Sequence, residues 1–166
     1  MNFLKQFTEK KNLLLQKENI YYTILIIIIF SLDRISKIKI VSNFNDGTYF
    51  INDFINFNLI WNTGIGFGFL SSNTPLFYNI VTFIVGLTII ILFYFSIVSK
   101  NFDKLIYSII IGGACGNFYD RLIYSAVPDF IDIHYNSFHW FTFNVADIFI
   151  TFGIVIFIFK SYFEKN

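Results

Sequence analysis

The chain has 166 residues, which is enough for one domain, and 55% of them are hydrophobic and 22% aromatic. These fractions exceed those of ordinary soluble domains and predict a polytopic membrane protein. The net charge is +1, so neither the basic surplus of a nucleic-acid binder nor an acidic tail is present. The single cysteine, Cys115, excludes an intramolecular disulfide and a thiolate metal cluster.

Four apolar stretches are long enough to cross a bilayer, whose core needs roughly 20 residues of helix. The expected transmembrane helices cover residues 20–41, 77–99, 104–122 and 143–163, with outer loops at 42–76 and 123–142. The first stretch follows a Lys-bearing leader, but no small-x-small cleavage site follows it, so we expect a retained helix. We therefore expect an all-α polytopic fold in one integral membrane domain over residues 1–166.

Basic residues predict the orientation, because those in short cytoplasmic loops resist translocation. They precede the first helix, join the second to the third, and end the chain: Lys5, Lys10, Lys11, Lys17, Lys100, Lys104, Lys160 and Lys165. The two outer loops contain no Lys or Arg, so both termini are expected in the cytoplasm. Arg34, Lys37, Lys39 and Arg121 fall at the outer helix ends, where we expect carboxylates to pair with them.

The first outer loop reads as short strands separated by Asn and Gly, at residues 49–51, 54–61 and 64–70. We expect a small extracytoplasmic sheet resting on the membrane. In the first helix, Asp33 and Lys37 are four residues apart and share one face, which predicts an ion pair. A structural clamp is the simpler interpretation of this pair, and a chemical role is the alternative.

The third helix carries small and polar residues at helical spacing near its outer end. Gly112, Gly116 and Asp120 form one stripe, and Gly113, Asn117 and Arg121 form the adjoining one. These stripes favour either close helix packing or a face toward a substrate, and the spacing leaves both open. Cys115 lies among apolar neighbours and is interpreted as a packing residue.

Two aspartates stand at the boundary between outer segments and membrane. Asp129 follows Pro128, which forbids helix continuation, so we expect Asp129 on irregular backbone at the outer surface. Asn144 is a plausible N-cap of the fourth helix, with Asp147 completing a capping box. Capping alone could explain Asp147, although this cap heads into lipid.

Such a pair of carboxylates suits aspartic protease chemistry, because like charges at close range share one proton and can act as acid and base. That chemistry needs no metal. His134 and His139 are five residues apart with no nearby Cys, which is weak support for zinc. We expect them at the membrane interface in an aromatic belt with Tyr135, Phe138 and Trp140.

Taken together, these pieces resemble the lipoprotein signal peptidase (signal peptidase II) family of bacteria. The matching segments are Asp33-Arg34-Ile35-Ser36-Lys37, Asn62-Thr63-Gly64-Ile65-Gly66-Phe67, Gly112-Gly113-Ala114-Cys115-Gly116-Asn117-Phe118-Tyr119-Asp120-Arg121, Val127-Pro128-Asp129-Phe130 and Phe143-Asn144-Val145-Ala146-Asp147. Each motif is weak alone, and five in the family's order are a specific match. Gly66, Gly68 and Pro128 depart from residues that are common in the family.

The resemblance implies an aspartic endopeptidase of the bacterial cytoplasmic (inner) membrane with its active site at the extracytoplasmic face. It implies that prolipoproteins are cut just before a cysteine carrying an S-diacylglyceryl group, and that globomycin inhibits the enzyme. Asp129 and Asp147 would be the catalytic pair. Substrate-binding or supporting residues would be Asn62, Gly64, Asn117, Arg121 and Asn144. Structural residues would be Asp33, Lys37, Gly112, Gly113, Gly116, Asp120 and Ala146.

The same resemblance implies a small β-cradle, and we expect no cofactor, no metal, membrane lipids as surroundings and a monomer. Two other classes stay open from the residues alone. A proton-coupled transporter would string carboxylates through the membrane midplane, whereas this chain gathers them at one boundary. A noncatalytic membrane scaffold would use the glycine and Asn-x-x-Asp segments for packing only.

Overall fold

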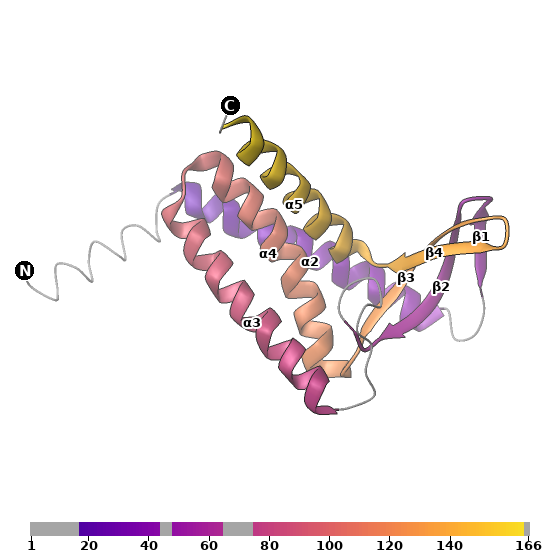
Figure 1. Ribbon diagram of the computed structural model, residues 1–166. Helices are drawn as coiled ribbons and strands as arrows, with labels where there is room; N and C mark the ends of the chain where they lie inside the picture. The colour runs from indigo at the N-terminus through magenta and orange to yellow at the C-terminus, as the bar shows by residue number, and fades with distance from the viewer. Residues whose placement is uncertain (1–16, 44–47, 65–74, 165–166) are drawn as a thin grey trace, which may run out of the picture.

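The computed structural model describes residues 17–43, 48–64 and 75–164. This part of the chain holds four long helices and one four-stranded antiparallel sheet (Figure 1). The helices are α2 (Lys17–Asn43), α3 (Pro75–Val98), α4 (Asn101–Tyr124) and α5 (Val145–Phe163). All four predicted helices are therefore present, with ends displaced by a few residues.

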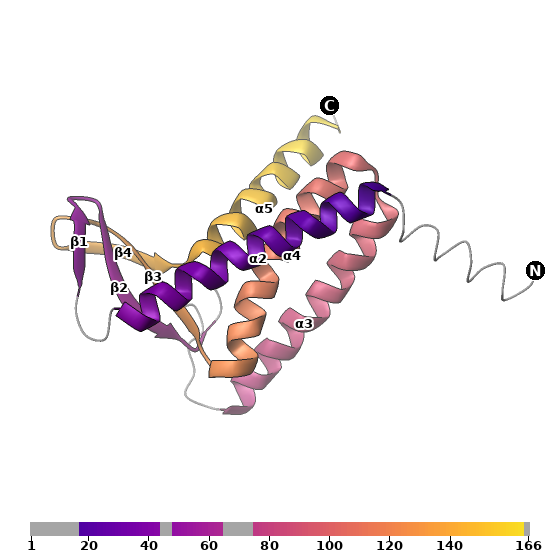
Figure 2. The ribbon, with the colours of Figure 1, turned by 180° about the vertical axis from the view of Figure 1, so that it is seen from behind.

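Helix α4 is the centre of the bundle, because it packs against α2, α3 and α5 (Figure 1 and Figure 2). Its glycines allow this close packing. A Cβ added at Gly112 would lie 2.7 Å from the Cβ of Ile29 in α2, and one at Gly113 would lie 2.5 Å from the carbonyl oxygen of Ala146 in α5. The glycine stripes thus let α4 approach two neighbours at once.

Two of the described helices, α3 and α5, are long and apolar enough to cross a membrane by length and composition. Only 22% and 17% of their most apolar windows are buried, so neither resembles the core helix of a soluble protein. Helices α2 and α4 carry charged residues near the sheet, including Asp33 and Asp120, which are fully buried. Burial between helices explains why these two are less apolar than a lipid-facing helix.

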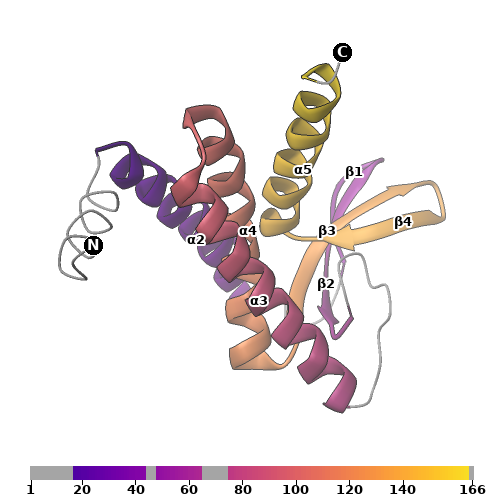
Figure 3. The ribbon, with the colours of Figure 1, turned by 60° about the vertical axis from the view of Figure 1, so that its left-hand side comes forward.

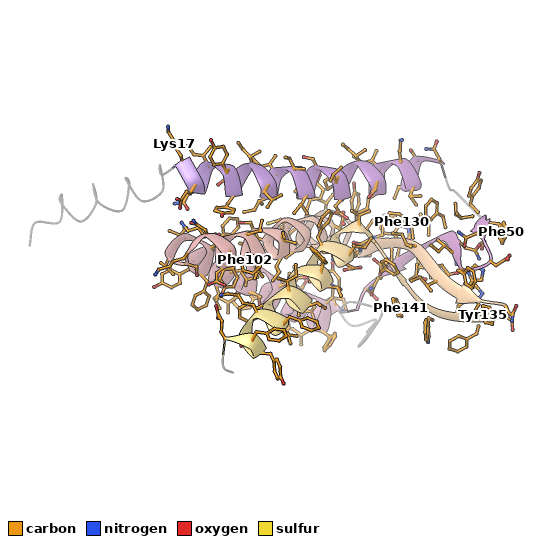
Figure 4. All side chains as sticks on the ribbon, turned by 90° about the horizontal axis from the view of Figure 1, so that it is seen from above. Lys17, Phe50, Phe102, Phe130, Tyr135 and Phe141 are labelled. Atoms are coloured by element: carbon orange, nitrogen blue, oxygen red, sulfur yellow. The ribbon has the colours of Figure 1, made fainter. Side chains whose placement is uncertain are left out.

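The sheet projects from one end of the bundle (Figure 3). Its strands are β1 (Tyr49–Asn52), β2 (Ile55–Asn62), β3 (Val127–Tyr135) and β4 (Phe138–Phe143), in the order β1-β2-β3-β4. The prediction of strands at 49–51 and 54–61 is confirmed, and the predicted strand at 64–70 lies outside the described residues from position 65 onward. Lys17 begins α2 at the opposite end of the molecule from Phe50 and Tyr135 in the sheet (Figure 4).

The expectation that Asp129 lies on irregular backbone is wrong. Asp129 is the third residue of β3 and pairs with Ile60 of β2, while Pro128 pairs with Trp61. Proline ends a helix, but its fixed φ suits the start of a strand, where one missing N–H is tolerated. The second outer segment therefore supplies half of the sheet, which had been expected from the first outer loop alone.

The sheet also corrects the interpretation of His134 as an interfacial residue. His134 and Asp132 are buried on β3, whereas Phe138 and Trp140 on β4 are 61% and 71% exposed. The Nδ1 atom of His139 lies 2.7 Å from Oδ2 of Asp132. The side-chain amide of Asn56 lies 3.5 Å from the ring of His134 inside the sheet, whereas His139 is 55% exposed and lies on β4 with the exposed aromatic side chains.

Candidate active site

Asp129 lies where the sheet meets the bundle, and its carboxylate is held by two amides. Asn62, the last residue of β2, donates from Nδ2 to Oδ2 of Asp129 at 2.8 Å. Asn144, the residue before α5, donates from Nδ2 to Oδ1 at 2.6 Å. The side chain is only 3% exposed, so both oxygens are bound and oriented in a nearly dry environment.

Asp147 is fixed by the start of α5. The predicted capping box is confirmed, because Asn144 Oδ1 accepts from the Asp147 backbone N–H at 3.1 Å and Asp147 Oδ2 accepts from the Asn144 N–H at 3.2 Å. The remaining oxygen, Oδ1, accepts from Nδ2 of Asn117 at 2.8 Å. Asn144 therefore contacts both carboxylates: its side-chain amide nitrogen donates to Asp129, and its backbone N–H donates to Asp147.

The environment of Asp129 favours its protonated form. Burial is the main cause, followed by the negative charge of Asp147, and together they raise the pKa of Asp129 to about 6. Hydrogen bonds from Asn62 and Asn144 and the charge of Lys37 act in the opposite direction. Two carboxylates that influence each other in this way can hold one proton between them near neutral pH.

A buried ion cluster lies behind this pair, with Lys37 at its centre. Its Nζ donates to Asp33 at 2.8 Å, to Asn117 at 2.8 Å and to Asp120 at 2.7 Å. The predicted Asp33–Lys37 ion pair is thus present. Asp120 also accepts from Arg34, so two cations face two carboxylates and the cluster is neutral.

This cluster is tied to the two aspartates by short links. Asn117 bridges Lys37 and Asp147. The second oxygen of Asp33 accepts from the backbone N–H of Ala146 at 2.9 Å, one residue before Asp147. Gly116 lies so close to Asp33 that any side chain there would collide with the carboxylate. The cluster therefore sets where α5 begins relative to α2 and α4.

Arg121 connects α4 to the segment that follows β2. Its Nη2 donates to the carbonyl oxygen of Gly64, whose N–H donates to Asn62 Oδ1 at 2.8 Å. The guanidinium is buried, and its Nη1 has no hydrogen-bond partner within the described ranges. Arg121 thus supports Asn62 and keeps an available donor in the same region.

The sequence-based expectation of carboxylate partners holds for two of the four outer basic residues. Arg34 and Lys37 pair with carboxylates, as predicted. Arg121 instead binds a backbone carbonyl, and Lys39 is exposed. The partnership of Arg34 with Asp120 was missed because 86 residues separate them, and no local pattern connects residues that far apart.

The predicted site residues otherwise gather at one place. Asn62, Asn117 and Asn144 contact the two aspartates directly, Gly64 contacts Asn62, and Arg121 contacts Gly64. Among residues 17–43, 48–64 and 75–164, no three His, Cys, Asp or Glu side chains group as a metal site requires. The arrangement offers paired carboxylates and amide donors, which can move protons and orient a carbonyl group.

This fold and site define a helical membrane protein with two buried carboxylates at the junction of its helices and a small sheet. The chain matches the family model of signal peptidase (SPase) II over residues 25–163. It is therefore a member of the signal peptidase II family.

Relatives and solved structures agree with this assignment. The chain is 43% identical to a lipoprotein signal peptidase of Pelagibacter ubique (strain HTCC1062), over 90% of this chain and 92% of that protein. It is 37% identical to one of Anaplasma phagocytophilum (strain HZ), over 86% and 92%. A bacterial membrane enzyme solved by the in meso method at 2.3 Å superposes with a TM-score of 0.72 at 27% identity, covering 88% of this chain and 90% of that one.

Proposed function

We propose that this protein is a membrane aspartic endopeptidase that removes the signal peptide from diacylglyceryl-modified prolipoproteins, cutting just before the lipidated cysteine. The observation that carries the proposal is the pair Asp129 and Asp147, bridged by Asn144 within a signal peptidase II chain. The name of its relatives, lipoprotein signal peptidase, supports the substrate class.

In the proposed mechanism the aspartate pair shares one proton. The ionised carboxylate takes a proton from water, whose oxygen attacks the scissile carbonyl carbon, while the protonated carboxyl donates to the carbonyl oxygen. When the tetrahedral intermediate collapses, the C–N bond breaks, the amine nitrogen receives a proton from the pair, and a hydroxyl group of the intermediate returns one, so that the pair again holds a single proton. The raised pKa of Asp129, about 6, supports a shared proton near neutral pH.

The surrounding residues would orient these groups. Asn62, Asn117 and Asn144 fix the carboxylate planes through their amides. Arg121 would use its unpartnered Nη1 to bind a substrate carbonyl, while its Nη2 donates to the carbonyl oxygen of Gly64. The structural role proposed for the remaining residues is to position α5, through Asp33, Lys37, Asp120, Ala146 and the three α4 glycines.

The proposed topology is four membrane spans with both termini in the cytoplasm, so that the aspartates lie near the outer surface of the bacterial inner membrane. The apolar, exposed faces of α3 and α5 support contact with acyl chains. A signal peptide is itself an apolar helix, and a lipidated cysteine holds the scissile bond near the headgroups. Binding energy from the acyl chains would then position the reacting carbonyl. We propose a single-domain monomer that is sensitive to globomycin.

The test is a gel-shift cleavage assay in detergent micelles with a diacylglyceryl-modified prolipoprotein and its unmodified precursor. We expect cleavage of the modified substrate only, and loss of at least about a thousandfold in rate for Asp129→Asn and Asp147→Asn. Asp132→Asn is the matched control, because Asp132 is also a buried carboxylate on β3 but contacts His139 instead. Near wild-type rates for either dyad variant would remove that residue from the mechanism.

A further inference from the structure

A separate pocket of about 200 Å³ lies between α2 and the end of α4, where α2 approaches the sheet. Its walls come from Arg34, Ile38, Val41 and Ser42 of α2 and from Tyr124 of α4. Lys37 and Pro128 of β3 also line it, and none of the lining residues within the described ranges is acidic. The pocket therefore presents the guanidinium group of Arg34, which also pairs with Asp120, on an otherwise apolar wall.

Arg34 is the cation in this pocket with donors to spare. The ammonium group of Lys37 already has three oxygen acceptors. Arg34 uses Nη1 for Asp120, but a guanidinium carries five N–H donors in one plane. The Tyr119 ring lies 4.5 Å and the Tyr124 ring 5.9 Å from its Cζ, so aromatic contacts help to hold that plane.

The surface around the pocket is apolar. Ile35 and Ile38 of α2 are 58% and 57% exposed, and Leu122 and Ile123 of α4 are 60% and 58% exposed. Such side chains are suited to contact with acyl chains. Asp120 already supplies one anionic partner to Arg34, and the planar fork of the guanidinium has further N–H donors whose geometry matches the oxygens of a phosphate.

We propose that this pocket binds the phosphate group of a phospholipid, with Arg34 as its principal ligand. The apolar wall formed by Ile38 and Val41 would cover the glycerol and the first acyl carbons, which favours a lipid over free phosphate. The site is independent of the proposed peptidase activity. The pocket is nonetheless connected to the proposed active site, because a chain of hydrogen bonds through Asp120, Lys37 and Asn117 joins Arg34 to Asp147.

Native mass spectrometry of the detergent-purified protein tests this site with two lipids of identical acyl chains, phosphatidylglycerol and diacylglycerol. We expect the first to bind about tenfold more tightly, because only it carries a phosphate for Arg34. Arg34→Gln should weaken phosphatidylglycerol binding by about tenfold. Lys39→Gln is the matched control, since it removes one charge from an exposed position of the same helix, and it should change binding less than about twofold.

A second variant keeps the test decisive if Arg34→Gln fails to fold. Val41→Phe fills the pocket without touching a charge and should also weaken phosphatidylglycerol binding. Wild-type binding by both folded variants, or equal binding of diacylglycerol, would overturn the proposal. Displacement of the lipid by millimolar inorganic phosphate would assign the site to a soluble anion and would equally overturn the lipid assignment.

Discussion

Replacing Asn62 with Ala should move the alkaline limb of the pH–rate profile to higher pH. Asn62 donates to Asp129 at 2.8 Å, which stabilises the ionised carboxylate and lowers its pKa. Without that donor the protonated form is favoured, so the pKa rises above its value of about 6. The shared proton is then retained to higher pH, and activity declines later as the pH increases.

The size of the shift follows from the hydrogen bond that is lost. A hydrogen bond to a charged group contributes about 1.5–3 kcal/mol, and water replaces part of it. Since one pKa unit corresponds to about 1.4 kcal/mol, we expect a shift of about one unit. At pH 7 the protonated fraction of Asp129 would rise from about a tenth to about a half, so relative activity at that pH would increase.

The assay measures cleavage of the lipid-modified substrate between pH 5 and 9 in steps of about half a pH unit, and the rates of each protein are normalised to its own maximum. Normalisation matters because Asn62 also accepts from the Gly64 N–H, and its loss lowers the maximum rate. Asn56→Ala is the matched control, since both amides are 8% exposed on β2 but Asn56 lies beside His134. If the Asn62→Ala profile coincides with wild type, Asp129 does not hold the proton that limits the rate.

Two further predictions concern stability. Gly113→Ala should lower the melting temperature by several degrees, because its Cβ would lie 2.5 Å from the Ala146 carbonyl oxygen and overpacking costs about 1–3 kcal/mol. Gly86→Ala is the control and should lower the melting temperature less, because its Cβ would meet the movable Phe118 ring at 3.0 Å. Equal melting temperatures for the two variants would contradict this packing argument. Lys37→Ala should reduce folded yield, since breaking a buried ion pair costs about 3–5 kcal/mol, whereas the exposed Lys39→Ala should not. A Lys37→Ala protein with normal yield and melting temperature but no activity would show a chemical role instead.

Sequence periodicity was sufficient for the helices and for part of the site. Apolar length predicted all four helices, and the Asn144–Asp147 spacing predicted the capping box, because both depend on neighbours within a few residues. Five short motifs in order identified the family. These are local signals, and each is set by residues that lie within one turn or one element.

The long-range contacts could not be obtained in this way. The second outer segment was not recognised as two strands, because Pro128 suggested a break and strand pairing depends on a distant partner in β2. The contacts of Asp129 with Asn62 and Asn144 join three elements. No spacing rule relates these residues, so their meeting is a property of the assembled bundle and sheet.

The neutrality of the buried cluster explains why four charged side chains are tolerated beside Asp129 and Asp147, whose charge changes in the proposed mechanism. Arg34 and Lys37 balance Asp33 and Asp120, so the cluster adds no net charge of its own. Its nearest cation to the dyad, Lys37, still lowers the pKa of Asp129 by its charge. The cluster therefore limits how far burial raises that pKa, and it keeps the carboxylate able to release its proton near neutral pH.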